Sequence, residues 1–234
     1  MKKAFILFSL LTFLLPASVF AAENSQIKYV ALTFDDGPHA KYTPIILDIL
    51  KKHDAKATFF VLGQRLEYEI LPEIVKQAEE EGHAIGSHMF DHAQPHQLSK
   101  EQLKKQISRT NELIYQITGN TPAILRPPYG QNNTRVTDVA AEMNMSVVLW
   151  NIDPRDSIIF DTNSIINSAV KEIKDGDIII LHDIFETSVN AVEPILKKLS
   201  DEGFTFVTVP ELISIKHGQI KPGETYKSGL EPCY

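Results

Sequence analysis

The chain has 234 residues, of which 43% are hydrophobic, and this is enough to bury one substantial core, so we expect a single domain. The composition excludes a collagen-like, coiled-coil or intrinsically disordered chain. The formal net charge is −7, and Lys and Arg are scattered along the chain instead of clustered. Because phosphate binding requires a basic groove, nucleic acid is not an expected partner.

The N-terminal segment has the three-part layout of a secretory signal peptide. Two lysines precede an apolar run over 4–15, and Pro16 followed by small residues ends it. We expect cleavage after Ala21, so that 1–21 is the signal peptide and 22–234 the mature domain. An uncleaved membrane anchor is the alternative, but the apolar run is short for a membrane span. We therefore expect an exported protein, in the periplasm or outside the cell, with no stable membrane insertion after cleavage.

Beyond this segment, short apolar runs with strand character alternate with longer amphipathic segments. The strand-like runs lie at 29–34, 57–62, 84–85, 123–125, 146–150, 178–181 and 204–207. Such alternation is typical of a parallel sheet, either open or closed into a barrel. The runs lack a glycine-rich dinucleotide turn, which disfavours an open nucleotide-binding sheet. We predict an α/β fold with about seven parallel strands.

The helices between the strands have recognisable ends. Ser99 with Gln102 forms a capping-box pattern before a long predicted helix over 100–118. Gly119 stands where that helix should stop, since glycine tolerates the left-handed conformation at a helix end. The apolar side chains of this helix recur at spacings of three, four and seven, which indicates a face that packs on the core.

The C-terminal part of the chain differs in composition from the rest. After His217 it is rich in Gly, Pro, Lys and Ser, and we expect an irregular tail outside a core that spans about 27–215. Cys233 is the only cysteine, so no internal disulfide is expected, and a domain of this size does not need one. We expect the mature protein to be a monomer.

Polar residues suited to catalysis gather where the predicted strands end. They are Asp35 and Asp36 after the first strand, His88 and His92 after the third, Arg126 after the fourth, Asp153 and Asp156 after the fifth, and His182 after the sixth. The active sites of parallel α/β folds lie beyond the C-terminal ends of the strands. We therefore expect these side chains to converge on one site.

The histidine pair indicates a metal site. His88 and His92 are four residues apart, a spacing that on a helical turn places both imidazoles on one face. Two histidines and one aspartate leave coordination positions open for water and substrate, as in a catalytic site. Zinc fits these ligands best, and cobalt, nickel or iron would also suit them. A surface histidine pair without a metal is the alternative.

Such a metal site favours hydrolysis of an amide or an ester. A bound divalent metal lowers the pKa of water to about 7 and polarises a carbonyl oxygen. Of the adjacent pair Asp35 and Asp36, the carboxylate that does not bind metal is a candidate general base. His182 is a candidate general acid because of its intrinsic pKa. The alternative is that the two aspartates form an acidic corner that only caps a helix.

Five segments together resemble a known family. Thr33 to Gly37, His88 to His92, Arg126 to Gly130, Asp153 to Asp156, and Leu181 to Asp183 are similar, in this order, to the five motifs of polysaccharide deacetylases, carbohydrate esterase family 4. The resemblance covers about residues 27 to 215. It implies a distorted (β/α) barrel and metal-dependent removal of acetyl groups from N-acetylglucosamine units of chitin-like or peptidoglycan polymers. An acetylated glycan is thus the implied partner.

The resemblance also implies roles for the candidate residues. Asp35 would be the general base and His182 the general acid. Asp36, His88 and His92 would bind one divalent metal.

The family pattern implies further roles around these groups. Arg126 would keep Asp35 ionised and oriented, and the backbone N–H of Tyr129 would stabilise the oxyanion. Asp156 would pair with the general acid and favour its protonated form. Leu181 would line the small pocket for the acetyl methyl group.

One position departs from the family pattern. Many members have Trp directly after the aspartate of the fourth motif, where it lines the substrate groove, and this chain has Ser157. Trp150, the only tryptophan, is expected to have a core role, and partial replacement of the missing groove-lining Trp is the alternative. The substrate therefore stays open: O-deacetylation of a xylan-type glycan and hydrolysis of a small non-glycan amide are enzymatic alternatives. A non-catalytic glycan-binding module would not need Asp35, Arg126 and His182 together.

Overall fold

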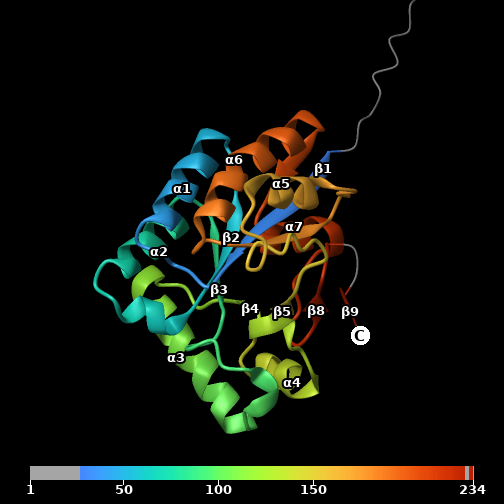
Figure 1. The fold of residues 1–234 in the computed structure, drawn as a ribbon. Coiled ribbons are helices and arrows are strands. Elements are labelled where there is room, and N and C mark those ends of the chain that lie inside the picture. Colours follow the sequence, from blue (N-terminus) through green and yellow to red (C-terminus); the bar gives the residue numbers. More distant parts are fainter. Residues whose placement is uncertain (1–26, 230–231, 234) are drawn as a thin grey trace, which may run out of the picture.

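The computed structural model describes residues 27–229 and 232–233, which form a curled sheet with helices packed around it (Figure 1). The predicted signal peptide, 1–21, lies outside the described residues. The strands are β1 (Lys28–Asp35), β2 (Ala57–Val61), β3 (Ala84–Ser87), β4 (Ile124–Leu125), β5 (Ser146–Val148), β6 (Ile178–His182), β7 (Phe204–Phe206), β8 (Thr225–Tyr226) and β9 (Pro232–Cys233).

Helices follow most of the strands. The α-helices are α1 (Tyr42–Lys52), α2 (Leu71–Glu80), α3 (Lys100–Thr118), α4 (Thr134–Glu142), α5 (Thr162–Val170), α6 (Glu186–Asp201) and α7 (Val209–His217), and the short 3₁₀ helices are η1 (Gly63–Glu67), η2 (Pro95–Gln97) and η3 (Pro128–Gly130). The predicted capping box of Ser99 and Gln102 is present at the start of α3, and Gly119 ends this helix with a left-handed φ of 76°. Both sequence signals are confirmed. Within the described residues, we find no helix with the length and apolar character needed to cross a membrane.

The sheet has the order β6-β1-β2-β3-β4-β5-β8-β9, and β7 pairs with the first half of β1. Among the described strands, every pairing is parallel except that of β8 with β9. A single bridge between Ile152 and Ile179 joins the segment after β5 to β6. This bridge brings the two sides of the curled sheet together. The predicted distorted (β/α) barrel of parallel strands is therefore confirmed.

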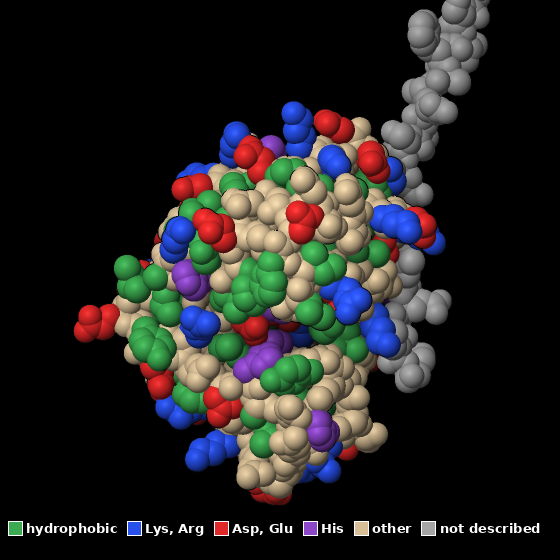
Figure 2. All heavy atoms as spheres, in the orientation of Figure 1, with side chains coloured by type: hydrophobic (Ala, Val, Ile, Leu, Met, Phe, Trp, Pro, Cys, Tyr) green, Lys and Arg blue, Asp and Glu red, His purple; other side chains and the backbone are tan. Residues whose placement is uncertain are grey.

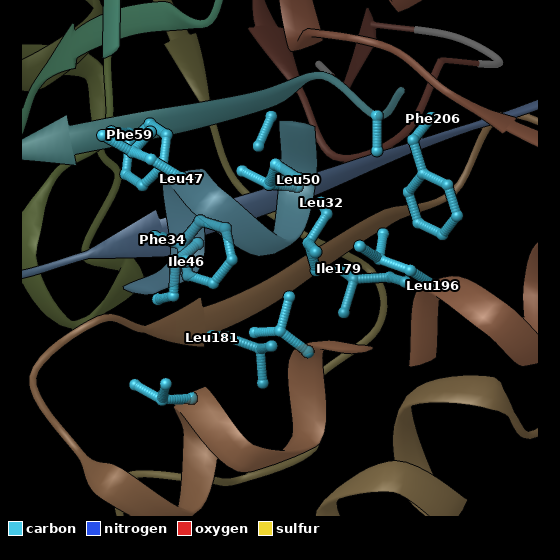
Figure 3. Close-up of a cluster of buried hydrophobic side chains, with 14 of the residues drawn as sticks. Leu32, Phe34, Ile46, Leu47, Leu50, Phe59, Ile179, Leu181, Leu196 and Phe206 are labelled. Carbon is cyan, nitrogen blue, oxygen red and sulfur yellow. The ribbon is translucent and has the colours of Figure 1, made fainter. Parts of the chain in front are cut away.

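The largest core cluster lies between the strands and helices α1, α5 and α6. Figure 3 shows Leu32, Phe34, Ile179 and Leu181 from β1 and β6 packed against leucines and isoleucines of the covering helices. Burying each such side chain contributes about 1.5–3 kcal/mol to folding. Because side chains alternate along a strand, residues on the other face of β1 and β6 are free to build the site.

The C-terminal segment differs from our expectation of an irregular tail outside the core. Residues of β8 pair in parallel with β5, so that Val147 lies beside Thr225 and Val148 beside Tyr226. Tyr226 is only 1% exposed and belongs to a core cluster. One of the two strands that pair with β5 is therefore β8, whose two residues are too few to produce a periodic sequence signal.

Candidate active site

The predicted site residues converge at the C-terminal ends of β1, β3, β4 and β6. The strand register places Asp35 beside His182 on neighbouring strands. Arg126 follows β4 and reaches Asp35 across the barrel. Figure 2 shows histidine and acidic side chains at the bottom of a hollow on this face, bordered by hydrophobic side chains. Convergence at one end of the strands is what the sequence analysis predicted.

Three side chains form a cluster that could hold a metal ion. Ligand atoms of Asp36, His88 and His92 all lie within 4.8 Å of one another. The Oδ1 atom of Asp36 is 3.4 Å from Nε2 of His88 and 3.3 Å from Nε2 of His92. The cluster is half open to solvent, because only His88 is buried in full while Asp36 and His92 are intermediate. Such an arrangement leaves room for water and substrate on one side of an ion.

The electrostatics of this cluster favour metal-binding protonation states. Burial alone would raise the pKa of Asp36, but the close approach of His88 and the charges of both imidazoles outweigh this effect and lower the pKa to about 2. Burial also lowers the pKa of His92 below its usual value. Metal ligands must be an ionised carboxylate and neutral imidazoles, and these shifts favour both forms at neutral pH.

The backbone between the two histidines is a loop and not the helical turn that we expected. Met89 and His92 have left-handed φ angles of 65° and 60°. The side-chain oxygen of Gln106 on α3 accepts hydrogen bonds from the backbone N–H of Phe90 and Asp91, at 2.9 and 3.2 Å. The imidazoles thus converge because two strained residues reverse the chain and a neighbouring helix holds it.

Asp35 is nearly inaccessible, at 2% exposure, and is held by a fully buried arginine. Nη1 of Arg126 donates to Oδ1 of Asp35 at 2.8 Å and to the hydroxyl of Thr33 at 2.7 Å. The other guanidinium nitrogens donate to the backbone carbonyls of Val148 and Leu149. A buried guanidinium with all these partners fixes the orientation of the carboxylate through a charge-assisted hydrogen bond.

His182 is held in a comparable way by Asp156. The Nδ1 atom of His182 donates to Oδ1 of Asp156 at 2.8 Å, and the backbone N–H of His182 donates to Oδ2 at 2.7 Å. The hydroxyl of Ser188 also donates to this oxygen, at 2.6 Å. Burial alone would lower the pKa of His182, but the hydrogen bond and charge of Asp156 raise it to about 9. The imidazole is therefore protonated at neutral pH.

Tyr129 lies at the rim of the cluster. It has a left-handed φ of 60° within η3, and its ring packs edge-on against that of His92 with centroids 4.5 Å apart. Trp150 packs in the core, where its ring lies 5.5 Å from the Arg126 guanidinium. Asp153 and Ser157 are exposed on the loop that precedes α5.

The structure contradicts one geometric expectation. Leu181 is fully buried and belongs to the core cluster that faces the helices, so it does not line a pocket at the site. Side chains alternate along β6, and those on the same face as His182 include Ile180. Leu181 is next to His182 in the sequence, but adjacent residues of a strand point to opposite faces of the sheet.

The sequence comparison decides the family. The profile described as polysaccharide deacetylase matches residues 22–148, which is more than half of the chain. The chain belongs to the polysaccharide deacetylase family. The predicted membership of this family is therefore confirmed.

Several curated relatives of this chain are named as peptidoglycan deacetylases. The peptidoglycan-N-acetylmuramic acid deacetylase PdaC of Bacillus subtilis (strain 168) is 41% identical over 189 residues, which cover 81% of this chain and 39% of the relative. This chain thus spans only about two fifths of the length of PdaC. A peptidoglycan-N-acetylglucosamine deacetylase of Bacillus cereus (strain ATCC 14579) is 40% identical over 195 residues, which cover 81% of this chain and 90% of the relative.

A solved structure supports the deacetylase fold. A family 4 acetyl xylan esterase from Clostridium thermocellum, in complex with a cobalt ion, has a TM-score of 0.80 and 32% sequence identity. The match covers 86% of this chain and 98% of the esterase chain.

The side chains of this deacetylase fit a divalent cation. Asp36 Oδ1 is buried without a hydrogen-bond partner and faces two imidazole nitrogens. Nδ1 of His88 donates to the backbone carbonyl of Arg126 at 2.8 Å, because a carbonyl can only accept. This bond leaves the lone pair of Nε2 free for a metal and orients the ring toward the cluster. An orphaned carboxylate oxygen and two oriented imidazoles form the donor set that zinc and related ions prefer.

Several supporting residues of the deacetylase site were not predicted from the sequence. Thr33 lies two residues before Asp35, so the two side chains share one face of the strand, and this spacing could have predicted the contact of Thr33 with Arg126. Gln106 and Ser188 act from helices and have no local sequence signal. Asp183 is fully buried beneath the loop after Asp36, and burial raises its pKa to about 7.

Proposed function

We propose that this protein is a metal-dependent deacetylase that removes the acetyl group from N-acetylated sugar units of peptidoglycan or a chitin-like oligosaccharide and releases acetate. The observation that supports this proposal most strongly is the convergence of three groups of residues. These are the metal-ligand cluster, the buried pair of Asp35 and Arg126, and the pair of His182 with the buried Asp156. The names of the relatives add that glycans of the bacterial cell wall are the substrates of similar enzymes.

In this proposal, Asp36, His88 and His92 hold one divalent cation, with zinc preferred and cobalt, nickel or iron as alternatives. When bound, such a cation lowers the pKa of water and polarises the amide carbonyl. The hydrogen bond from His88 to the Arg126 carbonyl keeps the imidazole in the tautomer whose Nε2 lone pair is free to bind the cation.

Asp35 acts as the general base. Its carboxylate lies 3.7 Å from Nε2 of His88, beside the ligand cluster, and accepts the proton of the attacking water. Arg126 keeps this carboxylate oriented through a charge-assisted hydrogen bond. Water oxygen forms the new bond to the carbonyl carbon, and the backbone N–H of Tyr129 stabilises the negative charge on the carbonyl oxygen.

His182 acts as the general acid. Its imidazolium gives a proton to the amide nitrogen as the carbon–nitrogen bond breaks, which releases acetate and leaves an amine on the sugar. A pKa of about 9 ensures that the proton is present at neutral pH. Ile180, on the same strand face as His182, takes the place that we had expected for Leu181 beside the acetyl methyl group.

We further propose that 1–21 is removed as a signal peptide and that the mature enzyme, 22–234, acts as a monomer in the periplasm or outside the cell. Peptidoglycan lies in these compartments, so the proposed substrate and the proposed location agree.

A second candidate function is O-deacetylation of a xylan-type glycan, because the structurally similar acetyl xylan esterase has the same overall fold. The test is acetate release from peptidoglycan, N-acetylglucosamine oligomers and acetylxylan under identical conditions. We expect acetate and an equal amount of free amine from an N-acetylated substrate. Release from acetylxylan alone would replace the first candidate by the second.

A further inference from the structure

An exposed aromatic side chain lies near His182 without a role in the proposed chemistry. Phe160 is 65% exposed and lies on the loop between Asp156 and α5. Ile158 on the same loop is 62% exposed. Exposing large apolar side chains costs hydrophobic free energy, and neighbouring exposed apolar groups commonly mark a binding surface.

The loop that carries Phe160 is anchored on both sides. The backbone N–H groups of Ile158 and Ile159 donate to the Arg155 carbonyl at 3.0 and 2.8 Å. Ile159 packs against the main core cluster, and the carboxylate of Asp161 caps the N-terminus of α5 at 2.7 Å. The exposed ring of Phe160 is thus presented by a backbone with fixed neighbours, which lowers the entropy lost when a ligand binds.

A second ring connects Phe160 to the site. The rings of Phe160 and Phe185 meet edge-on with centroids 5.8 Å apart. Phe185 is half-buried at the start of α6, and its ring lies 6.0 Å from that of His182. The two phenylalanines therefore form a continuous apolar wall from the protein surface to His182.

The other aromatic side chains near the site lie elsewhere. Tyr129 packs against His92, on the ligand side of the cluster. Trp150 lies against Gly130, where an added Cβ atom would be 3.0 Å from its ring, and contributes to the core. Neither can provide an apolar surface beside His182.

We propose that Phe160, supported by Phe185, is the platform on which a pyranose ring of the glycan lies beside His182. This inference rests on the proposed function, since it concerns the glycan of the same site. The axial C–H groups on one face of a pyranose carry partial positive charge, and the face of a phenylalanine ring is negative. Phe160 is a substrate-binding residue that selects ring-containing substrates and takes no part in proton transfer.

The test compares Phe160→Ala, Phe160→Leu and Phe160→Trp in the metal-loaded enzyme. Because stacking serves binding and not the chemical step, we expect Ala to raise KM for an N-acetylglucosamine oligomer about tenfold, with kcat changed less than about twofold. Leu keeps apolar area but has no flat ring, so it should resemble Ala, whereas Trp should restore the original KM.

Tyr115→Ala is the matched control, since Tyr115 is 56% exposed on α3. An unchanged KM in Phe160→Ala, or an equal rise of KM in the control, would contradict the proposed role of Phe160. Calorimetric titration of the oligomer separates this outcome from failure of the proposed function. If the enzyme releases no acetate but the oligomer binds about tenfold more weakly to Phe160→Ala, the result supports the binding role of Phe160 and contradicts the proposed activity. If the oligomer binds both proteins equally or neither, the platform is rejected.

Discussion

Asp35 and Asp36 are adjacent in the chain, but their carboxylates have different partners. Asp35 lies on the regular part of β1 and accepts a hydrogen bond from the buried Arg126. Asp36 has a left-handed φ of 71°, which turns its side chain toward His88 and His92. The break in strand geometry between them is what allows two neighbouring carboxylates to serve one site in different ways.

These partners predict different effects of two matched substitutions. Asp35→Asn should lower kcat by at least about a hundredfold, because the general base is lost, while the bound metal remains. Asp36→Asn should weaken metal affinity by more than about tenfold, because a ligand loses its charge. Metal content after dialysis, measured beside acetate release, distinguishes them. Equal loss of metal in both variants would mean that the two roles are reversed.

The pH dependence should identify the general acid. Asp156 raises the pKa of His182 to about 9, so the protonated acid is available below that pH and is lost as the pH rises through it. Asp156→Asn removes the negative charge and should shift the alkaline limb of kcat/KM to lower pH by about one unit or more. A pH profile of both proteins measures the shift. An alkaline limb at the same pH in the variant would exclude His182 as its source.

For single residues, the sequence predicted which residue types follow the strands better than it predicted the direction in which each side chain points. The catalytic and ligand candidates from Asp35 to His182 converge because each follows a strand of the same parallel sheet. Alternate residues of a strand face opposite sides of the sheet, and a fully apolar run does not reveal on which side Leu181 lies. The loop from His88 to His92 depends on a bond from Gln106, which comes from a distant helix.

Among the elements, β8 makes an unexpected contribution to the core. Tyr226 is almost fully buried, and its hydroxyl donates to Glu224 at 2.7 Å. Strands β1 to β7 were predicted because each lies in an apolar run between amphipathic segments. A strand of two residues in a segment rich in Gly and Pro gives no such pattern, and only its pairing with β5 defines it.

Removing the Tyr226 side chain should therefore destabilise the fold. We expect Tyr226→Ala to lower the free energy of unfolding by about 3–5 kcal/mol, as for other large-to-small changes in a core. Tyr115→Ala, at an exposed position, should change it by less than about 1 kcal/mol. Urea unfolding of the two variants provides the measurement. Similar stabilities would show that the C-terminal segment is not part of the core.

Over the whole molecule, curling of the sheet is what assembles the site. Arg126, at the end of β4, donates to Asp35 on β1 although two strands lie between them in the sheet. This bond spans the inside of the barrel, and the bridge between Ile152 and Ile179 helps to close it. Alternation of strands and helices predicted a parallel sheet, but closure depends on pairings between distant segments that no local pattern contains.

The central claim is that this fold carries out metal-dependent N-deacetylation of a glycan. The most direct measurement is acetate release from an N-acetylglucosamine oligomer by the mature protein, first with a chelator and then after zinc or cobalt is restored, with Asp35→Asn as the inactive control. We predict no release with chelator, recovery with metal, and no recovery in the variant. Undiminished release with chelator, or no release with either metal from any acetylated glycan, would contradict the account.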